Sequence, residues 1–469
     1  MQCSFWSPRG ILIAVWAAFL LSCGDTQGQI QTAATYGSVS VETATSEPIQ
    51  LTLTDALQRG LKHNLALLLG DQQSRAADAQ RRLAESRLQP NVTGAVSESV
   101  EQVNLAALGL SPSSFPGIPS IVGPFSVFDG RARLSQSLFN WSSIETVRAA
   151  RLDQRSAKLS YEDAREQVVQ VVTTLYLQAA AGTSRVNTAE AQFETAKALY
   201  TQAVSLKNSG VAAGIDVLRA QVQMQTQQQR VLSATNDLEK EKIALARAIG
   251  LPSEQQFSVV DPLSFADMTR PSFSEARNSA LNNRADYRQA KASVAAAQAS
   301  KQAAQSQRLP TVRFDADYGT LGNRPGSSHG TFTTAASLQF PIFDGGRIRA
   351  ETEQADSLLQ QREALLTNLS SRIEEDIRVA LLDLNNAAAQ VQVAQSSVEL
   401  AAQQLKQAQD RFRSGVANTI EVVQAQETVA SANESYIGSV FAYNLAKTSL
   451  ARATGVAEKD LASWLRTGG

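Results

Sequence analysis

The chain has 469 residues, carries 43 basic and 44 acidic side chains, and has a net charge of −1. A nucleic-acid-binding protein would show a basic stripe, so this balance of charges argues against nucleic acid as a partner. The only cysteines, Cys3 and Cys23, both lie near the N-terminus, so an exported form without its leader has no intramolecular disulfide.

The N-terminus has the pattern of a secretory signal. Residues 11–21 form an apolar run that is too short for the roughly 20 residues of a membrane helix, so we expect the mature chain to be exported. The Leu-Leu-Ser-Cys sequence at residues 20–23 resembles the lipobox of bacterial lipoproteins, in which the cysteine is acylated and becomes the new N-terminus. Cys23 is therefore a candidate lipid anchor, and ordinary cleavage near Gly24 or Gly28 is the alternative.

The rest of the chain is a duplicated unit, which has to be recognised before any other pattern is interpreted. Residues 209–221 recur as residues 414–426, each beginning with Ser-Gly-Val and continuing with Ile, an acid and Val. Upstream, Pro90 aligns with Pro310 at a larger shift, so the first copy holds about fifteen additional residues, of the kind that collect in surface loops. We divide the chain into a signal peptide at residues 1–23, a polar segment at 24–50, and two repeats at 51–261 and 262–469.

Long helices are predicted where prolines are missing. Residues 125–251 and 342–469 contain none, and an interior proline would cost a helix about 3 kcal/mol. Over about residues 140–207, and over residues 373–412 of the second copy, apolar and small residues recur in alternating steps of four and three, the pattern of a coiled coil. We predict a long helix over about residues 140–207 followed by a return helix to Gly250, and the same pair in the second copy. A shorter helix is predicted over about residues 55–88.

Between the helices the sequence pattern changes to strict alternation. In the second copy, residues 312–318 and 332–340 place apolar side chains on one face and polar ones on the other, over about nine residues, as in membrane β-strands. The first copy has a clear return strand at residues 131–138 and a weak outgoing strand after Pro90. For each strand pair, a hairpin in a soluble β-domain is the alternative.

Four strands cannot close a barrel, and lipid does not tolerate an open sheet edge. Two copies would give eight strands with a filled interior, whereas three would give twelve strands and a pore. We therefore expect a mainly α protein with a small membrane β part. Trimerisation would complete a β-barrel with four strands from each chain, and the long antiparallel helices would pack as coiled coils.

These residues resemble the TolC-like outer membrane efflux family over most of the mature chain. The resemblance rests on the duplication, on the two Ser-Gly-Val turns, and on Phe-Pro-Ile-Phe-Asp-Gly-Gly-Arg at residues 340–347, where a strand leads into a long helix. The first copy departs from this form at residues 138–141, which read Leu-Phe-Asn-Trp.

The resemblance implies a homotrimer in bacterial outer membrane lipids. Its long antiparallel α-helical coiled-coil barrel would continue from the twelve-stranded β-barrel and form a helical tunnel in the periplasm. Such channels passively export small molecules, including drugs and metals, in a tripartite pump with a periplasmic adaptor and an inner-membrane pump. A type I protein secretion duct is one alternative. A periplasmic coiled-coil adaptor or scaffold without a pore is another, from a different class of protein.

The resemblance also assigns the candidate site residues. The repeated turns would form the periplasmic tip and contact the adaptor, through Gly210, Val211, Gly415 and Val416. Asp216 and Glu421 would lie at a narrowed entrance, with Phe412 and Gln424 at gate positions. Family members have an aromatic hydroxyl, a second acid and in some cases a basic residue where this chain has Phe412, Gln424 and Ala417. For Asp216 and Glu421, the alternative role is that of a helix N-terminal acid stabilised by the dipole.

The sequence offers no sign of catalysis or of a bound cofactor. His63 and His329 lie far apart, and neither has a Cys, His or carboxylate neighbour at metal-ligand spacing. We expect His63 on a solvated helix face and His329 in a loop. The sequence also contains neither a phosphate-binding glycine loop nor a nucleophile elbow. We therefore expect no enzyme activity, no cofactor and no metal site.

Overall fold

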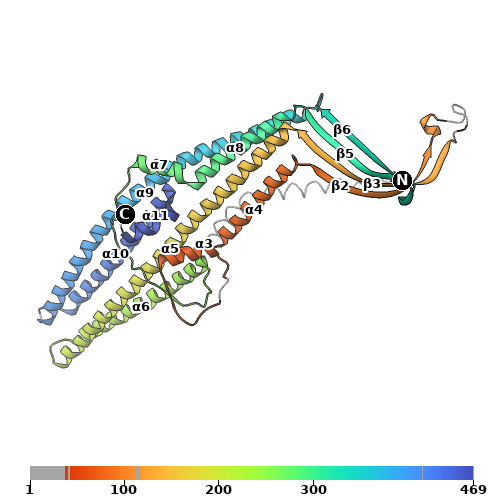
Figure 1. Ribbon diagram of the computed structural model, residues 1–469. Coiled ribbons are helices and arrows are strands. Elements are labelled where there is room, and N and C mark those ends of the chain that lie inside the picture. The colour runs from red at the N-terminus through yellow and green to blue at the C-terminus, as the bar shows by residue number, and fades with distance from the viewer. Residues whose placement is uncertain (1–36, 41–42, 111–116, 118, 415, 468–469) are drawn as a thin grey trace, which may run out of the picture. The chain divides into compact units, whose positions relative to one another are not determined.

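The structure, a computed structural model, describes residues 37–40, 43–110, 117, 119–414 and 416–467 (Figure 1). The first copy contains β1 (Ile49–Leu51), α3 (Leu53–His63), α4 (Leu65–Ser86), β2 (Asn91–Asn104), η1 (Ala106–Leu108), β3 (Ile121–Phe139), α5 (Trp141–Asn208), α6 (Gly214–Ile249) and β4 (Phe257–Val259). The second contains α7 (Phe273–Asn283), α8 (Ala285–Ser306), β5 (Thr311–Gly322), η2 (Pro325–Ser327), β6 (His329–Gln339), α9 (Arg347–Arg413), α10 (Thr419–Thr454) and α11 (Ala457–Thr467).

Helices dominate the fold, as the sequence predicts. The two long helices, α5 and α9, have 68 and 67 residues, and their return helices, α6 and α10, have 36 residues each. None of the helices in the described ranges has an apolar stretch long enough to cross a membrane.

The described residues form two compact units. Unit 1 takes its residues from Met1–Gln73, Leu159–Arg288 and Asn368–Gly469, and unit 2 from Ser74–Lys158 and Gln289–Thr367. Unit 1 contains α6, α10 and the parts of α5 and α9 that follow residues 158 and 367, and unit 2 contains the sheet with the first parts of the two long helices (Figure 1).

The prediction of one helix over residues 55–88 is wrong, because the helix breaks at Asn64. This residue is extended, with φ −66° and ψ 135°, and is completely buried. Its side-chain amide donates to the carbonyl of Ala248 at 3.2 Å, and its side-chain oxygen accepts from the amide of Ala66 at 2.9 Å. The bond to Ala66 caps α4, so the break satisfies backbone groups that a helix end would otherwise leave unpaired.

The second copy breaks at the equivalent residue, Arg284, between α7 and α8. Arg284 is also buried, and its Nη1 lies 3.5 Å from the carbonyl of Ala453, which is the counterpart of Ala248. Asp286 and Asp376 neutralise its charge at 2.7 and 3.0 Å. The same joint is therefore built twice, once with a neutral amide and once with a paired guanidinium.

Close packing at this joint explains the environment of His63. Gly250 ends α6 with φ 75°, and a Cβ at this glycine would lie 2.6 Å from the Cβ of His63. His63 is only 8% exposed, so the expectation of a solvated side chain is wrong. His329 is the exposed first residue of β6, where a loop was expected.

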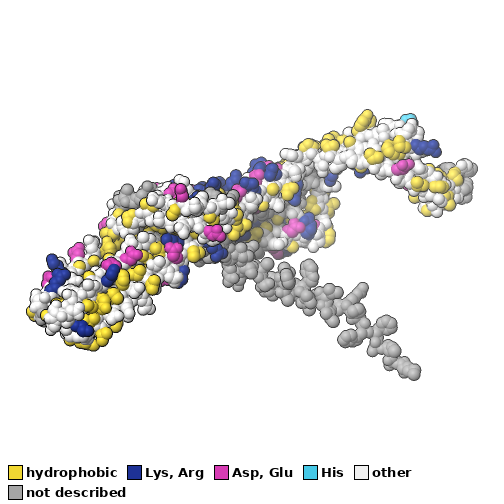
Figure 2. Space-filling model, turned by 90° about the horizontal axis from the view of Figure 1, so that it is seen from below, with side chains coloured by type: hydrophobic (Ala, Val, Ile, Leu, Met, Phe, Trp, Pro, Cys, Tyr) yellow, Lys and Arg dark blue, Asp and Glu magenta, His cyan; other side chains and the backbone are white. Residues whose placement is uncertain are grey.

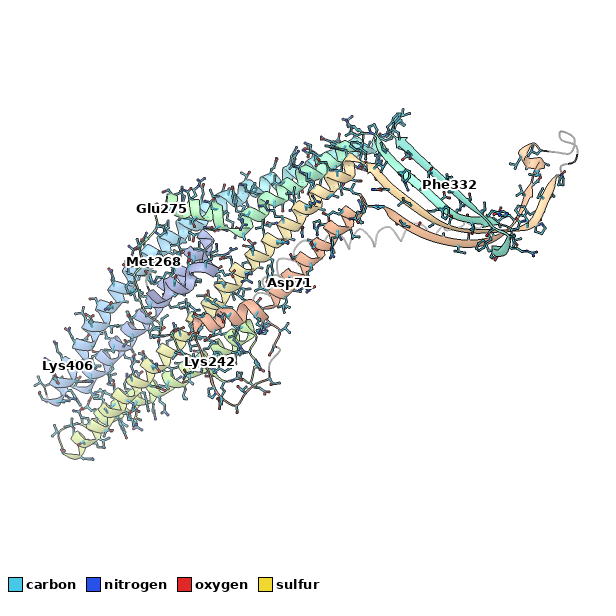
Figure 3. The ribbon with its side chains drawn as sticks, viewed as in Figure 1. Asp71, Lys242, Met268, Glu275, Phe332 and Lys406 are labelled. Atoms are coloured by element: carbon cyan, nitrogen blue, oxygen red, sulfur yellow. The ribbon has the colours of Figure 1, made fainter. Side chains whose placement is uncertain are left out.

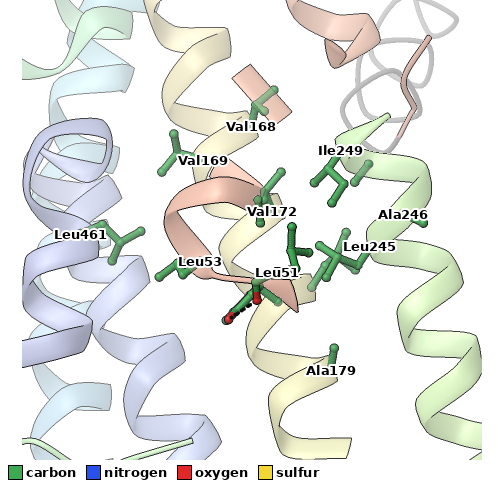
Figure 4. Close-up of a cluster of buried hydrophobic side chains, with 14 of the residues drawn as sticks. Leu51, Leu53, Val168, Val169, Val172, Ala179, Leu245, Ala246, Ile249 and Leu461 are labelled. Atoms are coloured by element: carbon green, nitrogen blue, oxygen red, sulfur yellow. Dashed lines mark hydrogen bonds between the residues drawn. The ribbon is translucent and has the colours of Figure 1, made fainter. Parts of the chain in front are cut away.

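Three apolar clusters stabilise unit 1. The first core cluster joins α3, α5 and α6 (Figure 4) and includes Leu51, Val168, Val172, Leu245 and Ile249. The second core cluster includes Ile373, Ile377, Leu384, Val440, Tyr443 and Leu450. The tip cluster consists of Leu199, Ala203, Ala220, Ala408, Phe412, Val422 and Ala425. On the long helices α5 and α9, heptad spacing buries Val168, Val172, Ile373, Ile377 and Leu384 along one seam of each helix, as expected from the sequence.

Unit 2 contains one antiparallel sheet, in the order β2-β3-β5-β6. The strands have 14, 19, 12 and 11 residues, longer than the sequence pattern indicated, and β2 forms a full strand although its alternation is weak. Within the described ranges, β2 and β6 each leave one edge without a neighbouring strand. A separate parallel pair in unit 1 joins β1 to β4.

Candidate functional site

The first repeated turn links α5 to α6 through a glycine helix cap. Gly210 has φ 79°, a left-handed conformation that glycine adopts without the steric penalty of a Cβ. Its amide donates to the carbonyl of Lys207 and the amide of Val211 to that of Leu206, both at 2.9 Å. These two bonds define a Schellman motif, which satisfies carbonyls at the end of the long helix.

The second repeated turn keeps one of these two bonds within the described residues. The amide of Val416 donates to the carbonyl of Arg411 at 3.0 Å, the counterpart of the bond from Val211 to Leu206. Gly415 lies outside the described residues. On the far side of the turn, the side chain of Asn418 caps α10 by accepting from the amide of Glu421 at 3.3 Å.

Both turns expose apolar side chains. Val211 is 69% exposed and Val416 is 71% exposed, and Leu218, near the start of α6, is exposed as well. Hydrophobic side chains also lie on the visible surface of the helices in Figure 2. Exposed apolar residues at a hairpin end are suited to contact with another protein.

The two candidate entrance acids, Asp216 and Glu421, each pair with an arginine of their own hairpin. Asp216 lies 3.5 Å from Arg219, one turn further along α6, whereas Glu421 lies 3.3 Å from Arg411 at the end of α9. Both acids also lie in the first turn of their helices, where the helix dipole favours a carboxylate.

The other two candidate gate residues have different environments. Phe412 is 7% exposed and packs in the tip cluster with Leu199 and Val422. Gln424 is exposed on α10. The structure therefore groups Phe412 with the apolar core and Glu421 and Gln424 with the surface. Cys23, the candidate lipid anchor, lies outside the described residues.

The sequence did not predict one polar contact between the hairpins, which joins α6 to α10. The carboxylate of Glu427 on α10 accepts from the side chains of Gln223 at 2.8 Å, Gln227 at 3.1 Å and Arg230 at 2.6 Å, all on α6. Burial disfavours the charged form of Glu427, but the hydrogen bonds from Gln223 and Arg230 outweigh it and lower the pKa of this carboxyl. Gln223, Gln227 and Arg230 are four and three residues apart, which is the spacing of a coiled-coil seam. This spacing is the signal in the sequence that could have indicated the contact.

A second missed contact involves Lys447, which is completely buried in α10. Its ammonium donates to the carbonyls of Ala266, at 2.5 Å, and Trp464, at 3.0 Å. The contact ties the segment between β4 and α7, and the C-terminal helix α11, to α10. Nearby Met268, labelled in Figure 3, donates its amide to the hydroxyl of Tyr443 at 3.1 Å.

The sheet of unit 2 has one apolar and one charged face. Ala132, Tyr318 and Phe332 form one cross-strand row, and Phe332 is labelled in Figure 3. Tyr318 and Phe332 are 73% and 72% exposed. On the other face, Arg131 pairs with Asp129 and, at 3.3 Å, with Asp317. A sheet with this alternation can contact lipid on one side and water on the other.

Across the part of the chain that the structure describes, no group of three His, Cys, Asp or Glu side chains is placed to hold a metal ion.

Known proteins resemble this chain in sequence and in fold. A family model described as outer membrane efflux protein matches residues 56–251 and 276–456. The pyoverdine export outer membrane protein OpmQ of Pseudomonas putida is 24% identical over 351 residues, covering 70% of each chain. The outer membrane efflux protein BepC of Brucella suis is 24% identical over 420 residues, covering 86% of this chain and 85% of BepC.

Among solved structures, the CmeC outer membrane channel of Campylobacter jejuni superimposes with a TM-score of 0.74 at 19% identity, covering 92% of this chain and 95% of CmeC. The fold is therefore that of TolC-like outer membrane channels. Since the family model covers most of the sequence, in both copies, the chain belongs to the outer membrane efflux protein family.

Proposed function

We propose that three copies of this chain form a passive outer membrane channel, which exports small molecules from the periplasm to the exterior as part of a tripartite efflux pump. Residues 51–261 and 262–469 are its two repeats, and the helical hairpins of unit 1 line the periplasmic part of the duct. No enzymatic step is required of the chain, because transport through such a channel is driven by the pump.

The sheet of unit 2 is the observation that carries this proposal. Its apolar face suits lipid, its charged face suits water, and β2 and β6 have free edges within the described residues. Backbone groups on those edges must be paired inside a membrane, and other copies of the chain supply the missing strands. Three copies give twelve strands, enough to surround a pore, whereas the interior of eight is filled by side chains.

The names of relatives support small molecules as the cargo. OpmQ is named for the export of pyoverdine and BepC for efflux, and neither name mentions protein secretion. We therefore favour small-molecule efflux over a type I protein secretion duct.

The tip turns are the proposed contact with a periplasmic adaptor, which would connect the channel to an inner-membrane pump. Val211 and Val416 are exposed on the two turns and available for such a contact. Glu421 is the proposed lining of the entrance, together with Asp216, its counterpart in the first copy, and Gln424, three residues further along α10. Phe412 supports the entrance from the tip cluster.

The proposal is tested by the mass and conductance of the purified complex. Protein extracted from outer membranes in mild detergent should have three times the mass of the processed chain and should form ion-conducting pores in planar bilayers. A monomer, a dimer, or a trimer without conductance would contradict the channel. Recovery of the unlipidated protein in the soluble periplasmic fraction would instead support an adaptor or scaffold.

A further inference from the structure

The apolar core of unit 1 is interrupted along α6 and α10. On α6 the buried positions between Ala220, in the tip cluster, and Leu238 are Gln223 and Gln227. On α10 the tip cluster ends at Ala425 and the next residue, Gln426, is buried. Gln223, Gln227 and Gln426 are only 6%, 2% and 6% exposed. With Glu427 they form a polar layer at positions where a coiled coil ordinarily has apolar side chains.

A half-open cavity of about 360 Å³ adjoins this layer, between α5, α6, α9 and α10, and its lining includes the exposed residues Asn187 and Ala191. It is lined by uncharged side chains only: the apolar ones are Ala191, Leu405 and Val429, and the polar ones are Asn187, Thr188, Gln192, Thr195, Gln227, Gln426 and Asn433. An ion would find no compensating charge there, whereas amides and hydroxyls provide both donors and acceptors.

Gln426 points to the occupant of this cavity. Among the described residues, neither its side-chain nitrogen nor its side-chain oxygen has a hydrogen-bond partner, although both atoms are buried. Buried polar groups in folded proteins are almost always satisfied, and ordered water is the usual partner where protein groups are missing. The cavity has room for several molecules, since water occupies about 30 Å³ in the liquid.

We propose that this cavity binds ordered water through the amide of Gln426, and that the polar layer is a hydrated joint between the tip cluster and the two core clusters. Water molecules exchange partners without leaving a buried group unsatisfied. The tip ends of the hairpins can therefore shift at this level at a lower cost than the flanking apolar layers, whose close packing resists displacement.

Glu427 limits this movement. Its three bonds to Gln223, Gln227 and Arg230 join the hairpins through protein groups alone, and charge assistance makes them stronger than the contacts through water. The joint thus has a fixed side at Glu427 and an exchangeable side at Gln426. The chain can hold one position of the tip while keeping others accessible.

The inference is tested on the full-length protein in its purified assembly, without an export assay, so its outcome is separate from that of the proposed function. A structure at high resolution should contain ordered water within hydrogen-bond distance of both amide atoms of Gln426. In hydrogen exchange, Gln426→Met should slow exchange in residues 427–435 by about fivefold, because it replaces a hydrated amide with an apolar side chain of similar length. Glu427→Gln should accelerate exchange in the same segment by about tenfold, the effect expected from losing charge-assisted hydrogen bonds.

Matched variants control for surface effects. Gln228→Met changes an exposed glutamine next to the buried Gln227, and Glu434→Gln removes an exposed ion pair with Arg185 one heptad beyond Glu427. Neither should alter exchange in residues 427–435. Faster exchange in Gln426→Met, equal effects of Glu427→Gln and Glu434→Gln, or a Gln426 amide bonded only to protein groups would overturn the inference.

Discussion

Arg411 and Glu421 form an ion pair across the second turn, with Nε and Oε1 3.3 Å apart. Each stands five residues from Val416, which is at the centre of the turn. In the first copy Leu206 replaces Arg411, and Asp216 pairs instead with Arg219, whose counterpart in the second copy is Gln424. Each copy therefore keeps one arginine beside its entrance acid, in different positions. Both side chains of the Arg411 pair are about half exposed, so its contribution to folding is small and its effect on the local charge is the more important.

The first prediction concerns ion selectivity. In the proposed trimer, Arg411→Gln should increase the preference for cations because it leaves three Glu421 carboxylates uncompensated, and Glu421→Gln should decrease it. Reversal potentials of the purified channel in a salt gradient measure both changes, which should weaken at high salt. Trimer stability should be unaltered. If the two substitutions shift selectivity in the same direction or not at all, Glu421 does not line the entrance.

The second prediction concerns the turn glycine. Gly210 and Gly438 both have open space where a Cβ would be added, but only Gly210 has a positive φ. Gly210→Ala should therefore destabilise the tip by about 1 kcal/mol, whereas Gly438→Ala, in the middle of α10, should stabilise its helix by about 0.5–1 kcal/mol. Limited proteolysis at the tip and thermal unfolding measure these effects. Equal behaviour of the two variants would contradict the role of the Schellman turn.

The long helices were predictable from the sequence and their interruptions were not. Two signals predict these helices, the lack of proline and the heptad pattern. Both can be recognised from residues that are close in sequence, and both occur in α5 and α9. The breaks at Asn64 and Arg284 involve neither proline nor glycine. They depend on bonds to Ala248 and Ala453, which are more than 150 residues away in sequence. The helical sequence pattern therefore shows no interruption at Asn64 or Arg284, although tertiary contacts hold both residues in a non-helical conformation.

The candidate site divides in the same way. The two turns follow from a local rule, since a glycine after a helix favours a left-handed cap. Glu427 and its partners on α6 required the register between two hairpins that are separated by some 200 residues. Phe412 was expected at a gate position because of the family resemblance, and its burial in the tip cluster follows from packing that the repeat alone does not reveal.

The third prediction concerns the N-terminus. If residues 20–23 act as a lipobox, Cys23→Ala should abolish incorporation of labelled fatty acid, while the assembled trimer should still be recovered from the outer membrane fraction. Mass spectrometry of the mature N-terminus measures the modification, and Cys23→Ser serves as a second variant without a thiol. A wild-type chain that begins after Cys23 and carries no lipid would show that ordinary signal cleavage is used.

The last prediction follows from the burial of Lys447. Removal from water, opposed by the charge of Asp267, lowers the pKa of this ammonium from 10.5 to about 8. Between these two pKa values the side chain is protonated in the unfolded chain and neutral in the folded chain, so the free energy of unfolding rises with pH. Below about pH 8 the side chain is charged in both states, and burial of the charge then destabilises the fold by its full amount. Lys447→Met removes this dependence. The stability of the wild type relative to this variant should therefore increase between about pH 8 and pH 10, as measured by denaturant unfolding of the purified assembly.

Lys406→Met, at an exposed position of α9 labelled in Figure 3, is the control and should retain the wild-type dependence. If wild type and Lys447→Met respond to pH identically, the ammonium is hydrated in the assembly and the buried contact with Ala266 and Trp464 is not maintained.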